Sequence, residues 1–136
     1  MPLFTWSNEY SVGVGSMDSH HKTLFEIMNK LHDAMKQGQA EDRIAATIHE
    51  LVDYTVYHFG EEEKIMERIS YAGIGAQKRE HVAFVDKMNE YKAKADSGKA
   101  IFTVAEVADT SVRWLREHIL GMDKKYEETM KAHGVS

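Results

Sequence analysis

Four separate segments of this 136-residue chain carry histidine or carboxylate side chains at helical spacing. These residues are His21 in the first segment, His58 and Glu62 in the second, His81 in the third, and His118 and Asp123 in the fourth. They are spread over most of the chain, so no local motif accounts for them. A four-helix bundle would bring them to one buried position, because its helices direct side chains into a common core.

Hydrophobic periodicity predicts four helices and therefore an all-α chain. We expect these helices over approximately residues 19–36, 41–68, 75–97 and 103–132. The only proline is Pro2, so nothing interrupts long helices. Gly38, Gly73 and Gly98 mark short connections, which favour antiparallel neighbours in an up-down bundle.

The first 17 residues follow a different pattern. Large apolar residues fall on even positions among polar residues and glycines, namely Phe4, Trp6, Tyr10, Val12 and Val14. We expect an extended arm (1–17) that packs across the bundle (18–136), the two forming a single domain. Where the arm meets the first helix, Ser16 or Asp18 can cap the helix.

Composition excludes several classes of function. The chain has no cysteine, which rules out disulfides, zinc–thiolate sites and iron–sulfur clusters. A net charge of −5 without a long basic run argues against a nucleic-acid partner. No apolar stretch approaches a membrane span, and the N-terminus lacks a signal-peptide core. We therefore expect a cytoplasmic domain that does not itself insert into a membrane.

Ionisable residues occupy core positions where the helical pattern calls for Leu or Ile. They are His58 and Glu62 on the second helix, His81 on the third and His118 on the fourth. A lone buried histidine is usually satisfied by a hydrogen bond, and a structural polar cluster is the alternative interpretation here. Unpaired, however, these four side chains would cost more than a typical domain's stability. A metal ion pairs with all of them, and nitrogen and oxygen donors suit a first-row transition metal such as iron.

Spacing within the helices fits metal ligation at two places and is irregular at a third. His58 and Glu62 are four residues apart, as are Gln77 and His81, so each pair shares a helix face. Five residues separate His118 from Asp123, which is roughly 140° around an ideal helix. The apolar stripe slips at the same place, so we expect a π-bulge or local unwinding near Gly121. The alternative is that Asp123 is a solvated surface residue.

In the first helix, two adjacent histidines compete for the site. Periodicity alone slightly favours His20, which lies nearer the centre of the Leu24–Met35 face than His21 does.

The chain resembles the hemerythrins, and in particular bacterial hemerythrins, over essentially its whole length. The motifs that carry the resemblance are His21-Lys22-Thr23-Leu24-Phe25, His58-Phe59-x-x-Glu62-Glu63-x-x-Met66, Tyr71 followed by His81, Trp114-Leu115-x-x-His118-x-x-x-x-Asp123, and the Trp6 arm. The resemblance selects His21 rather than His20 as the ligand. The chain looks closest to the hemerythrin domain at the cytoplasmic end of a methyl-accepting chemotaxis receptor from a sulfate-reducing bacterium. This resemblance implies that the domain senses oxygen and that its partner is the rest of such a receptor.

The resemblance also implies a cofactor and a ligand set. Hemerythrins hold two irons joined by an oxo or hydroxo bridge, and they bind O2 or small anions such as azide and peroxide. By resemblance, Glu62 and Asp123 bridge the irons. His21 and His58 would serve one iron, and His81 and His118 the other. The oxygen pocket would be lined by Leu24, Phe59, Leu115 and Ile119, with Trp114 nearby.

One residue departs from the family pattern, which has His-x-x-x-His in the third helix. This chain has Gln77 in place of the first histidine. Gln77 still lies on the core-facing side of the third helix, which directs it at the metal. An amide oxygen is a weaker ligand than imidazole, so the iron on this side is expected to be weakly held or solvent-ligated.

Oxygen binding without catalytic residues is therefore the expected function, and two alternatives stay open. The opened coordination position at Gln77 can support diiron peroxidase- or oxidase-like chemistry. A ferritin-like site is disfavoured, because no Glu precedes a histidine by three residues. The second alternative is a non-redox metal-binding module.

Overall fold

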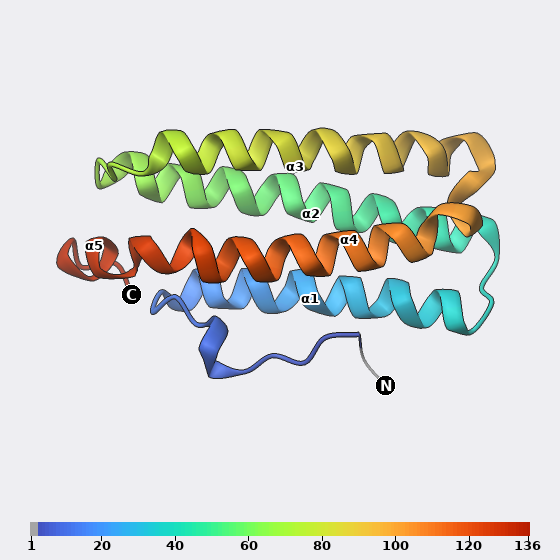
Figure 1. The fold of residues 1–136 in the computed structure, drawn as a ribbon, viewed down its shortest axis with the longest axis horizontal. Coiled ribbons are helices and arrows are strands. Elements are labelled where there is room, and N and C mark those ends of the chain that lie inside the picture. The colour runs from blue at the N-terminus through green and yellow to red at the C-terminus, as the bar shows by residue number, and fades with distance from the viewer. Residues whose placement is uncertain (1–2) are drawn as a thin grey trace.

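A computed structural model describes residues 3–136 as a bundle of four long helices (Figure 1). The long helices are α1 (Gly15–Lys36), α2 (Glu41–Arg68), α3 (Ile74–Lys94) and α4 (Ala100–Gly121). They alternate in direction, and no strand occurs among residues 3–136. The predicted all-α, antiparallel up-down four-helix bundle is confirmed. Within the described part of the chain, no helix is both long and apolar enough to cross a membrane.

Shorter elements flank and join the long helices. These are η1 (Asn8–Tyr10), η2 (Ala95–Lys99), η3 (Asp123–Tyr126) and α5 (Glu127–Ala132). The predicted bounds of the second helix are confirmed, whereas the fourth begins at Ala100 and does not continue unbroken to residue 132. Gly38 and Gly98 lie in the connections with φ of 66° and 82°, a left-handed conformation that costs glycine little.

The start of α1 differs from the prediction. The helix begins at Gly15 with Val14 at the N-cap, and neither Ser16 nor Asp18 caps it. The Asp18 carboxylate instead accepts hydrogen bonds from the Ser11 hydroxyl (2.6 Å) and the Val12 backbone N–H (2.9 Å). The side chain therefore fastens the arm to the helix, a use that periodicity does not reveal.

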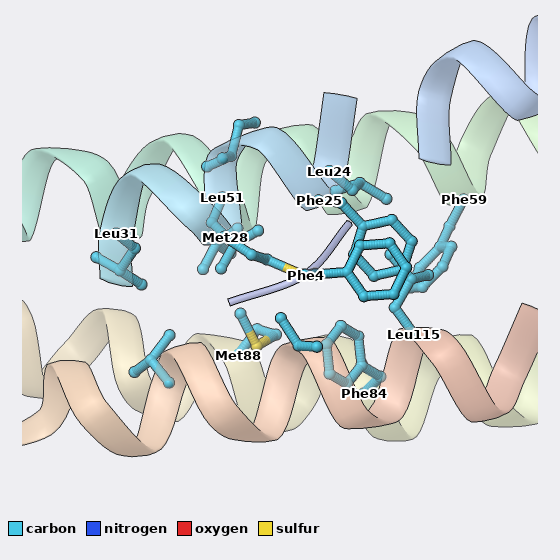
Figure 2. Close-up of a cluster of buried hydrophobic side chains, with 14 of the residues drawn as sticks. Phe4, Leu24, Phe25, Met28, Leu31, Leu51, Phe59, Phe84, Met88 and Leu115 are labelled. Atoms are coloured by element: carbon cyan, nitrogen blue, oxygen red, sulfur yellow. The ribbon is translucent and has the colours of Figure 1, made fainter. Parts of the chain in front are cut away.

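The N-terminal arm packs on the bundle as expected, with the η1 turn interrupting its extended course. The Phe4 ring stacks on Phe25 at a centroid distance of 3.6 Å (Figure 2). The Asn29 side chain accepts from the Phe4 N–H at 2.9 Å and donates to the Phe4 carbonyl at 2.8 Å. Val12 and Val14 are fully buried. The arm thus extends the hydrophobic core beyond the four helices.

The buried polar residues are grouped toward one end of the bundle, with buried apolar residues before and after them along the helices, such as Met17 and Leu24 around His21. Leu31 and Met88 are also among the buried apolar residues (Figure 2). The polar residues lie where the start of α1, the end of α2, the start of α3 and the end of α4 meet, at the left of Figure 1. The alternating helix directions therefore bring distant positions in sequence to one end of the bundle.

Candidate metal centre

All seven residues predicted at the metal site are buried and lie together. None of these side chains is more than 3% exposed. The seven residues are His21, His58, Glu62, Gln77, His81, His118 and Asp123. The interpretation of Asp123 as a solvated surface residue is wrong, because none of it is exposed. The structure thus places six strong donors and one amide at a common position inside the bundle.

A break in the fourth helical segment positions Asp123. Regular α4 ends at Gly121, Met122 has φ −115° and ψ −54°, and Asp123 begins the 3₁₀ turn η3. The predicted local unwinding near Gly121 is confirmed, and it is a 3₁₀ turn rather than a π-bulge. The altered rotation brings Asp123 Oδ1 to 3.1 Å from His118 Nε2.

The carboxylates of Glu62 and Asp123 each have one oxygen near His21 and the other near a histidine on the opposite side of the site. Glu62 Oε2 lies 3.7 Å from His21 Nε2 and 3.6 Å from His58 Nε2, whereas Glu62 Oε1 lies 3.2 Å from His81 Nε2. Asp123 Oδ2 lies 3.3 Å from His21 Nε2, and its Oδ1 faces His118. We call His21 and His58 the His58 half, and Gln77, His81 and His118 the Gln77 half. Glu62 and Asp123 span the two halves.

The imidazoles of the Gln77 half face each other through nitrogen atoms. His81 Nδ1 lies 2.8 Å from Glu63 Oε2, and His118 Nδ1 lies 2.9 Å from Glu80 Oε1. Since carboxylates accept, both neutral rings keep their hydrogen on Nδ1. The two Nε2 atoms, 3.2 Å apart, then present lone pairs to each other. Two facing lone pairs repel each other, so this arrangement is stable only with an added proton or a metal cation between the two nitrogen atoms.

The His58 half is held differently. His58 Nδ1 lies 3.0 Å from Nδ1 of His20, which is half-buried and belongs to α1. His21 Nδ1 has no hydrogen-bond partner among the described residues. Both adjacent histidines therefore take part, with His21 inside the site and His20 behind His58. Sequence reasoning treated them as competitors and missed the second contact.

Several buried polar atoms fit a bound metal ion. Within residues 3–136, no hydrogen-bond partner exists for His21 Nε2, His58 Nε2, Glu62 Oε1, Asp123 Oδ2 or Gln77 Oε1. Unsatisfied buried polar atoms are rare and costly. Two groups have donor atoms close enough for one ion each, namely His21 with His58 and Glu62, and Glu62 with His81 and His118. Glu62 is common to both groups, so the donor set fits two adjacent ions.

The pKa values of the buried donors show how strongly each donor depends on its neighbours. Burial acts to lower the pKa of His21, but Asp123 and Glu62 outweigh it and raise the pKa to about 9. Burial lowers the pKa of His58 to about 3, against a partial opposing effect of Glu62. Burial acts to raise the pKa of Glu62, yet His58, His21 and His81 hold it well below its usual range.

Comparison with protein families decides the affiliation of this site. The family model that describes the hemerythrin HHE cation binding domain matches residues 12–129 of this chain. The chain belongs to the hemerythrin family. It is 35% identical to a bacteriohemerythrin of Pseudomonas aeruginosa over 100% of this chain and 86% of that protein. It is 30% identical to a myohemerythrin of Riftia pachyptila over 91% of each.

Solved structures show the same relationship. A crystal structure of wild-type hemerythrin aligns with a TM-score of 0.83 and 36% identity, covering 94% of this chain and 98% of that one. The resemblance to bacterial hemerythrins is confirmed at the level of the family.

In this hemerythrin-family chain, Gln77 contacts a carboxylate that spans the two halves. Its Nε2 donates to Asp123 Oδ1 at 2.9 Å, while its Oε1 has no partner in the described structure. The amide therefore lies within the buried cluster, against Asp123. Its unpartnered oxygen is the atom that can act as a metal donor.

Tyr126 is a contact that sequence reasoning missed. Its hydroxyl donates to Glu62 Oε2 at 2.8 Å, and the side chain is fully buried in η3. Burial and the neighbouring Glu62 raise the pKa of Tyr126 well above its usual value, so it remains a donor. The only sequence signal was its place on the shifted apolar stripe.

The residues expected to line an oxygen pocket divide between two positions. Leu24, Leu115 and Ile119 are buried in the core. Phe59 stacks on His81 at 3.8 Å and Trp114 on His118 at 4.4 Å, measured between ring centroids. The two aromatic residues therefore lie against the imidazoles of the Gln77 half.

Proposed function

We propose that this chain is a non-heme diiron protein that binds O2. The observation that carries the proposal is the division of Glu62 and Asp123, each with one oxygen toward each half of the site. Such carboxylates can bridge two ions, and imidazole with carboxylate donors suits iron. Membership of the hemerythrin family supports the same assignment.

In the proposed arrangement, His21 and His58 hold one iron. His81 and His118, with the Gln77 oxygen as a weak donor, hold the other. Tyr126 holds Glu62 through its hydroxyl. Glu63 and Glu80 orient the rings of His81 and His118, as acceptors behind metal-bound histidines commonly do.

Two ferrous ions, when bound, supply the electrons that O2 needs for reversible binding. The part of the chain is to orient the donors and to exclude water. Leu24, Leu115 and Ile119 are at most 1% exposed and suit a water-poor pocket. Phe59 and Trp114 cover the imidazoles of the Gln77 half.

An anaerobic-to-aerobic visible spectrum tests the proposal. The chain is loaded with ferrous ion without oxygen, and oxygen is then admitted and removed. We expect a visible band that appears with O2 and disappears when O2 is withdrawn. Glu62→Ala is the negative control. Iron-loaded protein that stays colourless in O2 would indicate a non-redox metal-binding module instead.

A finer proposal is that the domain senses oxygen for a chemotaxis receptor in the cytoplasm. It is supported by the sequence resemblance to receptor-linked hemerythrin domains. Cells that carry a receptor with this domain should lose their oxygen response when Glu62→Ala is introduced, while responses to other attractants persist. An unchanged oxygen response would contradict it.

Peroxidase-like activity is a second candidate, and Gln77 is the residue that favours it. Its amide hydrogen-bonds Asp123 where the family has imidazole, which leaves the iron of the Gln77 half with fewer strong donors. Turnover of hydrogen peroxide with a reducing dye should then fall in Gln77→His. Equal turnover in both proteins would remove this candidate.

A further inference from the structure

The contact between His20 and His58 has no part in the ligand set described above. Nδ1 of His20 lies 3.0 Å from Nδ1 of His58. Adjacent residues on a helix are roughly 100° apart, so His21 enters the site while His20 faces α2. Tyr54 and Tyr57 flank the His20 ring at centroid distances of 5.9 and 5.4 Å. The ring is thus confined between α1 and α2.

The contact restricts where His58 carries its hydrogen. A hydrogen bond between two Nδ1 atoms needs a hydrogen on one of them and a lone pair on the other. His58 Nε2 is buried, faces Glu62 and has no hydrogen-bond partner in the described structure. An Nε2 lone pair can bind a metal only if the His58 hydrogen is on Nδ1. His20 must then accept at Nδ1 and carry its own hydrogen on Nε2.

We propose that His20 is a positioning residue for the diiron centre, fixing the orientation and tautomer of His58 by accepting its Nδ1–H. The inference rests on the proposed function, because it assumes a metal at His58 Nε2. It assigns His20 a role distinct from that of a ligand.

The nature of the acceptor gives this role a chemical consequence. His81 and His118 donate to the carboxylates of Glu63 and Glu80, whereas His58 donates to an imidazole. An anionic acceptor raises the basicity of the metal-bound ring more than a neutral one does. His20 therefore orients His58 without adding negative charge to the His58 half.

Three variants test the inference in the iron-loaded protein. His20→Ala removes the acceptor, and His20→Gln supplies an amide oxygen that can replace it. His32→Ala, on the same helix and outside the site, is the matched control. The first readout is iron release to an excess of chelator. We expect His20→Ala to release one of two irons about 10–100-fold faster, with His20→Gln close to wild type.

A second readout separates positioning from a general loss of packing. The exchangeable imidazole N–H signal of His58 is followed by NMR in the diferrous protein. We expect its exchange with solvent to accelerate in His20→Ala and to be restored in His20→Gln. Destabilised packing alone would not be rescued in this selective way.

The outcomes distinguish this inference from the proposed function. A wild-type chain that binds no iron overturns both. A wild-type chain that holds two irons, together with wild-type release and exchange rates in His20→Ala, overturns only the role of His20. Faster release that His20→Gln does not restore also contradicts it, because the lost feature would not be the hydrogen-bond acceptor.

Discussion

The two halves of the candidate metal centre differ in what stands behind their imidazoles. In the Gln77 half, His81 and His118 are each backed by a carboxylate, Glu63 or Glu80. In the His58 half, His58 is backed by the neutral ring of His20, and His21 has no partner at Nδ1 within the described structure. The half that contains the Gln77 amide thus has the anionic acceptors.

This difference bears on how strongly the proposed iron of the Gln77 half would be held. A carboxylate behind a histidine strengthens that histidine as a donor. Glu63 and Glu80 can therefore offset part of what the amide oxygen fails to supply. Glu62 and Asp123 contact both halves, so their loss should be more severe than any change on one side.

The largest effect is expected for Glu62→Ala. This change removes an oxygen from each half and leaves Tyr126 without its acceptor. Iron content after anaerobic reconstitution should fall close to zero, and the metal-free chain should melt at a lower temperature, since breaking a buried charged network typically costs about 3–5 kcal/mol. Glu50→Ala, exposed on the same helix, is the control. Retention of two irons would rule out a bridging role for Glu62.

Removing one carboxylate acceptor should affect one half only. We expect Glu63→Ala to accelerate iron release from the Gln77 half by about 10–100-fold and to leave the other iron nearly unchanged. Biphasic release to a chelator measures this directly. Glu67→Ala, an exposed carboxylate on α2 that pairs with Lys78, is the control. If both phases accelerate equally, the two halves are not held independently.

The metal-free protein should be most stable near pH 6.5 and should lose stability progressively as the pH rises from 6.5 to about 9. The folded pKa of His21 is raised from 6.5 to about 9, so its stabilising effect is complete below 6.5 and is lost as the pH rises through 9. The folded pKa of His58 is lowered from 6.5 to about 3, so stability falls as the pH drops from 6.5 toward 3. Denaturant unfolding across this range measures the effect. Stability that is flat up to pH 10 would contradict the charged His21.

The smallest of these changes is expected for Gln77→His. Imidazole is the stronger donor, so the change should tighten the iron of the Gln77 half and lengthen the life of the oxygen-induced colour. Correspondingly, the present chain should bind azide more readily there. Stopped-flow decay compares the two proteins, and Gln77→Leu, which removes both the amide oxygen and the hydrogen bond to Asp123, gives the baseline without either. Equal lifetimes and iron affinities would show that Gln77 already serves as an adequate ligand or contributes nothing.

The sequence predicted the core seams well because burial follows helical periodicity. His58, Glu62, His81 and His118 are all buried at the core positions that periodicity gave them, and the shifted stripe indicated the break beside Asp123. These features depend on the chain's own pattern and need no knowledge of how helices pack.

The contacts around the imidazoles could not be predicted in the same way. Glu63 and Glu80 are partly exposed and look like ordinary surface charges in the sequence. Their partners lie on other helices, so the contacts depend on how the helices are rotated and aligned with one another. The same holds for His20 with His58, and for Asp18, which reaches back to the arm instead of capping α1.

Mössbauer spectroscopy of the chain loaded with ⁵⁷Fe tests the central claim most directly, because it reports the number of irons and the difference between their surroundings. Two irons held by unlike halves should give two quadrupole doublets of equal area, with iron analysis showing two irons per chain. Gln77→His should shift one doublet and leave the other in place. A single doublet at one iron per chain, unchanged by excess ferrous ion, would contradict the two-iron centre.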